Sequence, residues 1–470
     1  MKNEVVASGL PAPRGRTRSV SALLVGAVLV YGLLEAMIVP ALPLIQGGIG
    51  ATQAEAGWII SAMALVGAVA TPVVSRLADI RDRRRVFLGV LAVVFVGIAT
   101  AGLAPSVLVF AIGQGLQGAG VGLVPLAVGI VRDTEPPERL RRTNGLFVGG
   151  LAVANAAGVL LAGPLLSALP YQWLYWLALI VLVPLLAFAV AVMPSYPPSV
   201  RGRVDSAGAA LLGLGVVALL LAITFAASTG WASAPVLGLG AAAIVALAGF
   251  VLVERRVADP LVDLRLGGSA VLIVHVTAFA AGVSSAVLMI AVPRIAAAPA
   301  ATGYGLGSTA VATGLIMFPL GVLGAVSAPL TGRLERLVGS RMVMVLSGAL
   351  LLAAGLIMVS GRSSAFVLAV GAGLVGVAIG TGLTQGVNII ALTLPADRVA
   401  SVTGLAYVLR AVGNAVGAQL AATVMALDLL PGTQLPTWNA ITWVFLGAGA
   451  VGALVAAVSF RLPARLTAAR

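Results

Sequence analysis

The sequence contains no cysteine and only one histidine, and each scarcity removes a class of chemistry. Without cysteine there is no disulfide, no thiolate metal site and no thiol nucleophile. The H-E-x-x-H pattern of zinc enzymes and the G-x-S-x-G pattern of serine hydrolases are absent. So is the G-x-x-x-x-G-K-[ST] loop of ATP-driven proteins. We therefore expect no enzyme, no catalytic residue, no metal and no cofactor.

Charged residues are also scarce, at 9% of the 470 residues, whereas 60% are hydrophobic and the mean hydropathy is +1.12. This balance is typical of a membrane protein with many spanning helices. The net charge of +13 does not predict a nucleic-acid partner, because the basic residues lie in short clusters between apolar runs. The expected surroundings are a lipid bilayer.

Long apolar runs are plentiful, and about 20 apolar residues are enough to cross a bilayer. The sequence predicts fourteen spans, at 20–45, 55–76, 86–104, 107–132, 144–168, 173–194, 207–227, 235–254, 270–293, 308–331, 342–360, 366–394, 402–427 and 440–461. With the N-terminus inside, 25 of the 28 Lys and Arg residues fall on the cytoplasmic side. This asymmetry supports the count and predicts a plasma-membrane protein with both termini in the cytoplasm. We expect the first span to be an uncleaved helix and not a signal peptide.

Two pairs of segments repeat at nearly the same spacing. Residues 71–86 align with 328–343, and residues 145–158 align with 404–417. Two six-helix halves in parallel order explain this repeat. The predicted organisation is a cytoplasmic tail at 1–19, an N-terminal six-helix bundle at 20–194, a linker with two additional spans at 195–269, a C-terminal six-helix bundle at 270–461 and a cytoplasmic tail at 462–470.

The most charged loop, SRLADIRDRRR at 75–85, lies between the second and third spans. Arginine costs about 2.5–3.5 kcal/mol at the centre of a membrane helix, so this loop marks one side of the membrane. It resembles the G-x-L-a-D-r-x-G-r-k loop of the major facilitator superfamily, although both glycines of that pattern are replaced. Five residues match: Leu77, Ala78, Asp79, Arg83 and Arg84. An ordinary positive-inside anchor is the alternative interpretation.

The linker adds a second resemblance, carried by the segments at 203–215, 230–239 and 254–266. They are similar to the linker of the fourteen-helix drug:proton antiporters within this superfamily, and the resemblance covers nearly the whole chain. It implies an all-α membrane protein with the major facilitator fold. Two six-helix bundles plus two inserted linker helices would make fourteen transmembrane helices, working by alternating access.

Two further motifs resemble those of the same family. QGLQGAG at 114–120 is similar to R-x-x-Q-G-x-G, with Gln117 matching and Gln114 replacing an arginine implicated in proton transfer. Glutamine cannot hold a charge, so this departure weakens the usual coupling route. GPLLSA at 163–168 resembles the antiporter signature G-P-x-x-G-G through Gly163 and Pro164. For the glycines of the first motif, a helix-packing role is the alternative.

Ionisable residues inside the predicted spans are few, and a charge at membrane depth indicates function by default. Glu35 precedes an A-L-P motif that the antiporters share, although it lies one residue after their acidic position. It is the proton- or cation-binding candidate, with Arg410 and Gln114 as further coupling candidates; a structural role for Glu35 is the alternative. Arg410 has three open interpretations: snorkelling to the interface, pairing with an acid, or facing the cavity. His275 is expected to be a wall residue.

Polar side chains within the spans are candidates for lining a transport pathway: Asn155, Asn414, Gln117, Gln385 and Asn388. By resemblance, Asp79, Arg83 and Arg84 form a cytoplasmic latch against the helix that begins near Ser401. The resemblance implies a monomeric secondary active transporter that exports small amphipathic or cationic compounds by proton antiport. Its partners are the small-molecule substrate and protons. The alternative is an uncoupled or differently coupled facilitator or importer of a metabolite on the same fold.

Overall fold

A computed structural model describes residues 14–51, 53–196, 205–257, 268–395, 398–433 and 435–463. The outer parts of both predicted tails, and parts of the linker segments at 203–215 and 254–266, lie outside these residues. The regular structure in the described residues is helical apart from one isolated bridge between Leu429 and Pro436.

The first half of the chain forms seven α-helices and one 3-10 turn. They are α1 (Arg14–Ile49), α2 (Gln53–Ile80), α3 (Arg83–Gly102), α4 (Val107–Gly118), η1 (Ala119–Gly122), α5 (Leu123–Thr134), α6 (Pro137–Ala168) and α7 (Trp173–Val192). The run from α4 through η1 to α5 is one membrane-spanning segment. Next come α8 (Ser206–Thr229) and α9 (Ala234–Glu254).

The second half consists of α10 (Gly268–Ala297), η2 (Ala300–Thr302), α11 (Ala310–Val359), α12 (Ala365–Thr393), α13 (Val399–Leu427) and α14 (Trp438–Ser459). At 50 residues, α11 would be about 75 Å long if it were straight, more than twice the thickness of a bilayer core. Its backbone leaves the helix at Gly339, where φ is 83° and ψ is 160°. Glycine tolerates this positive φ, so the chain turns there and α11 contains two spans.

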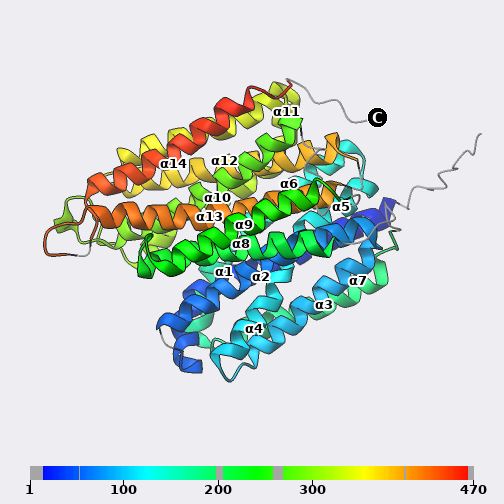
Figure 1. Cartoon of the computed structure of the whole chain (residues 1–470), viewed down its shortest axis with the longest axis horizontal. Coiled ribbons are helices and arrows are strands. Elements are labelled where there is room, and N and C mark those ends of the chain that lie inside the picture. Colours follow the sequence, from blue (N-terminus) through cyan, green and yellow to red (C-terminus); the bar gives the residue numbers. More distant parts are fainter. Residues whose placement is uncertain are drawn as a thin grey trace, which may run out of the picture.

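Thirteen helical segments of the described residues are long and apolar enough to cross a membrane, and the one at 311–359 counts twice because of this turn. The prediction of an all-helical, fourteen-span fold is therefore confirmed. The first turn of α1 and the last turn of α14 lie at the same end of the molecule, as an even number of crossings requires (Figure 1).

The helices form two groups, with α10 to α14 above and α1 to α4 and α7 below in Figure 1. The groups converge toward the right, where α2 leads into α3, and diverge toward the left. Arginine-rich segments at 81–85, 132–142 and 333–341 lie at the convergent end. We call it the basic end, and the other the opposite end.

The hydrophobic cores follow the same division. One large core contains residues of α1 to α7 and continues into the basic end of the second group through Val274, Val387, Ile390 and Val402. A second core contains only residues from α10 to α14 and the segments between them. The two groups are thus joined by a shared apolar core near the basic end.

The pair formed by α8 and α9 lies against the line where the groups meet. A third apolar cluster joins α8, through residues such as Leu212 and Val216, to Ala68 of α2 and to Val408 and Val412 of α13. The insert therefore contacts helices of both groups.

Candidate functional site

The predicted latch loop is buried at the basic end. Asp79 and Arg83 have 0% and 1% of their surface exposed. Arg83 donates from Nε to the carbonyl of Ala78 at 3.0 Å and from Nη1 to the carbonyl of Gly129 at 2.7 Å. It also forms an ion pair with Asp133, and its Nη2 lies 3.7 Å from Asp79 Oδ1. Buried charges are stable only when they are paired in this way.

Asp79 also reaches the other group of helices. Ser401, in the first turn of α13, donates its hydroxyl to Asp79 Oδ2 at 2.5 Å. A carboxylate at a helix N-terminus is favourable by about 0.3–1 kcal/mol, and by more when partly buried. The helices are also close: a Cβ added to Gly404 would lie 2.3 Å from Ser75 Oγ. The contact between α2 and α13 therefore combines a buried charge with tight packing.

The rest of the loop is tied to α7. Asp82 caps α3 by accepting from the Arg84 amide at 2.9 Å, and it accepts from Ser195 Oγ at 2.7 Å and from the Tyr196 amide at 3.0 Å. Partial burial opposes ionisation, but these hydrogen bonds outweigh it and lower the pKa of Asp82. Arg84 donates to the carbonyl of Val190 at 2.7 Å. Sequence reasoning missed this cap, although an aspartate just before a helix was a usable signal.

A second contact at the basic end joins α6 and α11. A Cβ added to Gly145 would lie 2.6 Å from the carbonyl oxygen of Ala328. At Gly149 it would lie 2.7 Å from that of Ala325. Nearby, Arg141 Nε lies 3.1 Å from Glu335 Oε2. Sequence reasoning did not single out this ion pair, because it depends on which faces of two distant helices meet.

The helix α12 makes a third contact with the first group. Asn144 of α6 donates to Asn388 Oδ1 at 3.0 Å, and both side chains are fully buried. Arg132 of α5 donates to the carbonyl of Ala391. Gln385 is also fully buried, and neither of its amide atoms has a hydrogen-bond partner within the described residues. In this conformation Asn388 is part of the closed basic end.

The α6–α11 pair differs at the opposite end. A Cβ added to Gly163 of α6, or to Gly314 of α11, would have no neighbouring atom within 4 Å in the described part of the chain outside its own helix backbone. Gly163 and Pro164 are exposed, and Ser167 donates to the carbonyl of Pro164 at 2.8 Å. Gly163 of the antiporter-like motif thus lies on a face of α6 without a close helix contact, whereas the adjacent Ala162 is buried in the large core.

Glu35 is exposed although it lies in the interior of α1. Contacts of its helix fix its direction. A Cβ on Gly32 would lie 2.5 Å from Leu151 of α6, and one on Gly120 of η1 would lie 2.3 Å from the ring of Tyr31. Because residues three and four apart share a helix face, Glu35 leaves α1 between α6 and η1. Its carboxylate interacts electrostatically with Arg410 of the other group.

Arg410 lies on the face of α13 that is directed neither toward α2, nor toward α8, nor toward the closest backbone contact with α10. Gly404 faces α2, Gly413 faces Phe279 of α10, and Val412 packs in the α8 cluster. The remaining face carries residues at helical spacing: Tyr407, Arg410 and Asn414. Asn414 is exposed and donates to Ser285 Oγ at 3.4 Å.

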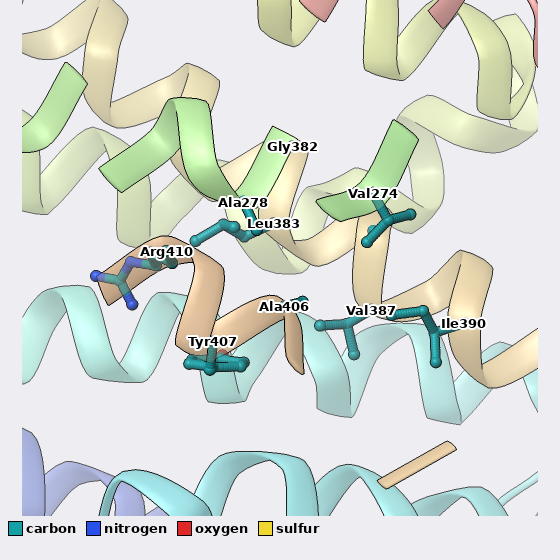
Figure 2. Close-up of a pocket in the computed structure, with 10 residues that line it drawn as sticks. Val274, Ala278, Gly382, Leu383, Val387, Ile390, Ala406, Tyr407 and Arg410 are labelled. Atoms are coloured by element: carbon teal, nitrogen blue, oxygen red, sulfur yellow. The ribbon is translucent and has the colours of Figure 1, made fainter. Parts of the chain in front are cut away.

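Tyr407 and Arg410 line a pocket together with side chains of α10 and α12, among them Val274, Leu383 and Val387 (Figure 2). The lining is otherwise apolar. Tyr407 also packs against the large core of the first group. The pocket therefore lies where the two groups of helices face each other.

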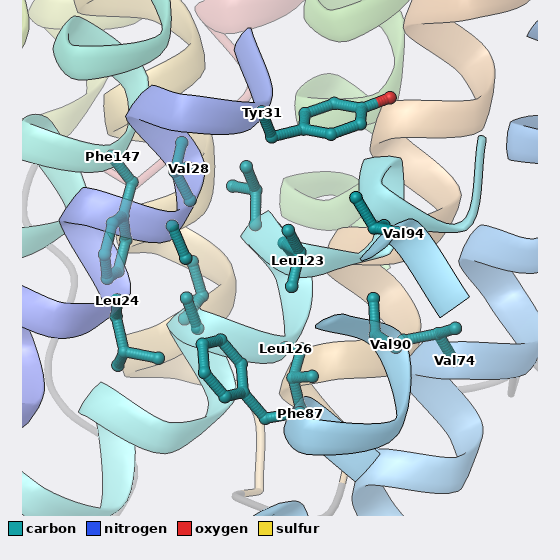
Figure 3. Packing of buried hydrophobic residues seen from close by; sticks show 14 of the residues in the cluster. Leu24, Val28, Tyr31, Val74, Phe87, Val90, Val94, Leu123, Leu126 and Phe147 are labelled. Atoms are coloured by element: carbon teal, nitrogen blue, oxygen red, sulfur yellow. The ribbon is translucent and has the colours of Figure 1, made fainter. Parts of the chain in front are cut away.

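Tyr31 lies one turn before Glu35 on α1. Its ring belongs to the large core, whereas its hydroxyl points away from the surrounding apolar side chains (Figure 3). The residue is 7% exposed, and within the described residues the hydroxyl has no hydrogen-bond partner. It interacts electrostatically with Glu35.

The remaining candidates have packing contacts. Gln114 donates to Tyr175 Oη of α7 at 3.0 Å, and Gln117 donates to the carbonyls of Gly97 and Gly113. Both glutamines are buried inside the first group. Asn155 is half-buried and donates to the carbonyl of Leu151 at 2.9 Å.

His275 lies 3.3 Å from the carbonyl of Val402, at the contact of α10 and α13. The arrangement therefore brings Glu35, Tyr407, Arg410 and Asn414 toward the region between the groups, and leaves Gln114 and Gln117 away from it.

Comparison with known proteins agrees with the fold. Residues 24–208 match the family model described as the Major Facilitator Superfamily. Over these residues the chain belongs to this superfamily. The relatives that it resembles are named as transporters and export proteins, not as enzymes.

The chain is 30% identical over 354 residues to an uncharacterised MFS-type transporter of Mycobacterium tuberculosis. That match covers 75% of this chain but only 50% of the relative, so the chain spans about half of that protein's length. It is 29% identical over 435 residues to the tetracenomycin C resistance and export protein of Streptomyces glaucescens, covering 89% of this chain and 77% of the relative.

Among solved structures, the human organic anion transporter MFSD10 superposes with a TM-score of 0.69 at 18% identity, covering 95% of this chain and 100% of that one. At this identity the likeness shows the fold alone.

Proposed function

We propose that this protein exports small amphipathic compounds across the plasma membrane by proton antiport, through alternating access of one central site. The observation that carries the proposal is an accessible carboxylate, Glu35, between two groups of helices that are sealed together at the basic end. A carboxylate at this depth has a high free-energy cost, so its presence in a membrane helix indicates a function.

The orientation follows from the positive-inside rule, since the arginine-rich segments all belong to the basic end. That end, with both termini, is assigned to the cytoplasm, and the described conformation faces outward. The division into bundles at 20–194 and 270–461, with an inserted linker at 195–269, is supported by the separate core of the second group and the apolar contacts of α8.

Coupling is assigned to Glu35. In the outward-facing state it takes a proton from outside, and in the inward-facing state it releases the proton and accepts substrate. Gln114 is an unsuitable relay, because its amide is engaged with Tyr175 inside the first group. The names of relatives support export, since one is an antibiotic resistance and export protein.

The alternative is an uncoupled or differently coupled facilitator or importer. It is favoured by the neutral residue at position 114, where the resembling family carries an arginine.

Proton-driven flux in inverted membrane vesicles tests the proposal. Wild type is compared with Glu35→Gln, which removes the charge, and with Glu35→Asp, which keeps it, across a panel of amphipathic compounds. We expect substrate-dependent proton movement that is lost in Glu35→Gln and retained in part in Glu35→Asp. If proton movement survives in Glu35→Gln, antiport is supported but another residue must be the coupling group. Downhill flux that ignores the proton gradient establishes the facilitator.

A further inference from the structure

We propose that the transported compound is dipolar, with a cationic group that pairs with Glu35 and an anionic group that pairs with Arg410. This inference rests on the proposed function, because it places the substrate in the central site. It narrows the expectation of amphipathic or cationic compounds to those that carry both signs of charge, such as an amine together with a carboxylate.

The two charges belong to opposite groups of helices and face each other. Glu35 leaves α1 between α6 and η1, and Arg410 leaves α13 on the same face as Tyr407, whose ring packs against the core of the first group. They interact electrostatically, yet the direct ion pairs of the described residues do not include this one. Each charge therefore has room for another partner, and a molecule between them contacts both.

The charge balance at this site selects against compounds of one sign. A simple cation attracted to Glu35 is repelled by Arg410, and a simple anion attracted to Arg410 is repelled by Glu35. These effects are strong because an apolar site screens charge poorly. A dipolar compound replaces the interaction between Glu35 and Arg410 by two closer ones, so neither protein charge loses its partner.

The groups beside the two charges are of the kinds that such a compound needs. Apolar side chains of α10 and α12 and the ring of Tyr407 lie beside Arg410 (Figure 2). They surround a pocket of only about 10 Å³ in the described conformation, which is too small for the body of the molecule. The unpartnered hydroxyl of Tyr31, one turn from Glu35, supplies a further hydrogen-bonding group on the other side. This buried hydroxyl is an observation separate from the two charges, and its free donor is available to a bound molecule.

The pairing also fits the proposed antiport. The cationic group of the compound competes with a proton for Glu35, so the two are carried in alternate states. Arg410 keeps its charge throughout and holds the anionic group while this exchange takes place. An anion alone would instead bind together with the proton, which would move both in the same direction.

A matched pair of dyes tests the inference by binding. Tetramethylrhodamine carries a delocalised cation and a carboxylate, and its methyl ester carries the same cation without the carboxylate. Fluorescence anisotropy with the purified full chain measures both affinities. We expect the zwitterion to bind about tenfold more tightly than the ester, the difference of one charge-assisted contact.

Two variants test whether Arg410 causes the preference for the zwitterion. Arg410→Gln should abolish the preference by weakening the zwitterion and strengthening the ester, and Arg410→Lys should retain the preference because the charge remains. Ester binding by Arg410→Gln also reports that the variant is folded. A second pair, norfloxacin and its methyl ester, repeats the comparison on another scaffold by competition.

Equal affinity of wild type for both members of each pair overturns the inference, as does a preference that survives Arg410→Gln. Failure of both zwitterions to bind overturns it as well. Flux measurements in vesicles distinguish a failure of the dipolar-substrate inference from a failure of the proposed transport function. A zwitterion preference in binding without transport supports the site and rejects the transport function. Equal transport of dye and ester supports transport and rejects the dipolar substrate.

Discussion

The two ends of the α6–α11 contact are built from the same kind of residue but are in different states. At the basic end, Gly145 and Gly149 allow the backbone of α11 to approach so closely that a side chain would collide with it. At the opposite end, Gly163 and Gly314 have open space beside them. Small residues in membrane helices permit close contact. The open end therefore carries the same small residues that allow close helix contact at the basic end, although the described conformation makes no such contact there.

The register of the two helices identifies the residues that would form this second contact. A Cβ on Gly321 of α11 would lie 2.5 Å from Ala156 Cβ of α6. Gly163 follows Ala156 by seven residues, and Gly314 precedes Gly321 by seven, which is about two turns along each helix. Because the helices are antiparallel, the two glycines lie on the same faces and at the same height. We predict that they meet when the basic end opens.

The largest expected effect comes from locking either end. Gly149→Cys with Ala325→Cys should cross-link in the described conformation, and Gly163→Cys with Gly314→Cys only in the opposite one. The introduced thiols are the only ones in the chain, so the readout is clean. Oxidation should abolish transport in both pairs, and reduction should restore it. Cross-linking of both pairs in a single trapped conformation would contradict the alternation, because a disulfide needs Cα atoms about 4.4–6.8 Å apart.

The next largest effect is expected from overfilling the closed end. Gly145→Leu forces α6 and α11 apart at the basic end, at a cost of about 1–3 kcal/mol to the outward-facing state. Transport should fall about tenfold or more, and a cysteine introduced at Leu383 in the pocket should become reactive from the cytoplasm. Gly163→Leu is the matched control, since it leaves the described conformation undisturbed and should keep Leu383→Cys protected on that side.

A smaller effect is expected from the charge of the latch. Asp79→Asn keeps the size of the side chain but weakens its bonds to Ser401 and Arg83. Transport should fall about threefold to tenfold without loss of membrane insertion, corresponding to the loss of one charge-assisted contact. Asp79→Glu is the control that keeps the charge. A well-expressed Asp79→Asn protein with wild-type transport would show that the basic end is held by packing alone.

The smallest effect is expected from the ion pair between Arg141 and Glu335. Arg141 is 23% exposed on its side chain, so the pair is partly screened and is expected to contribute about 0.2–1 kcal/mol. Glu335→Gln should lower transport less than threefold, and added salt should reduce the difference from wild type. An effect as large as that of Asp79→Asn would mean that the two contacts at the basic end are of equal weight.

Much of the fold follows from the sequence because a bilayer imposes a fixed length on apolar runs and a sidedness on arginine. The turn at Gly339 illustrates this: two spans meet there within α11, and the apolar runs at 308–331 and 342–360 already separate them. Less of the candidate site could be predicted from the sequence. Periodicity indicates that Tyr407, Arg410 and Asn414 share a face, but it does not indicate what that face meets.

For the same reason, Gln114 and Glu335 could not be assigned from the sequence. Gln114 occupies a position linked to coupling in the resembling family, yet its helix presents it to Tyr175. Glu335 has no motif of its own and gains its charged partner, Arg141, only when α6 lies beside α11. Contacts between elements distant in sequence depend on the rotation of each helix, and a pattern within one helix leaves that rotation free.

The inserted helices have a mechanical consequence. Through α8 the insert touches α2 and α13, the two helices that the contact between Asp79 and Ser401 also joins. The cluster at α8 is purely apolar, and apolar attraction has no preferred direction. A hydrogen bond from Trp231 Nε1 to Thr423 Oγ1 at 3.3 Å also ties the turn after α8 to α13. We therefore expect the insert to stay attached to the second group and to act toward α2 as a bearing of low friction when the groups rock.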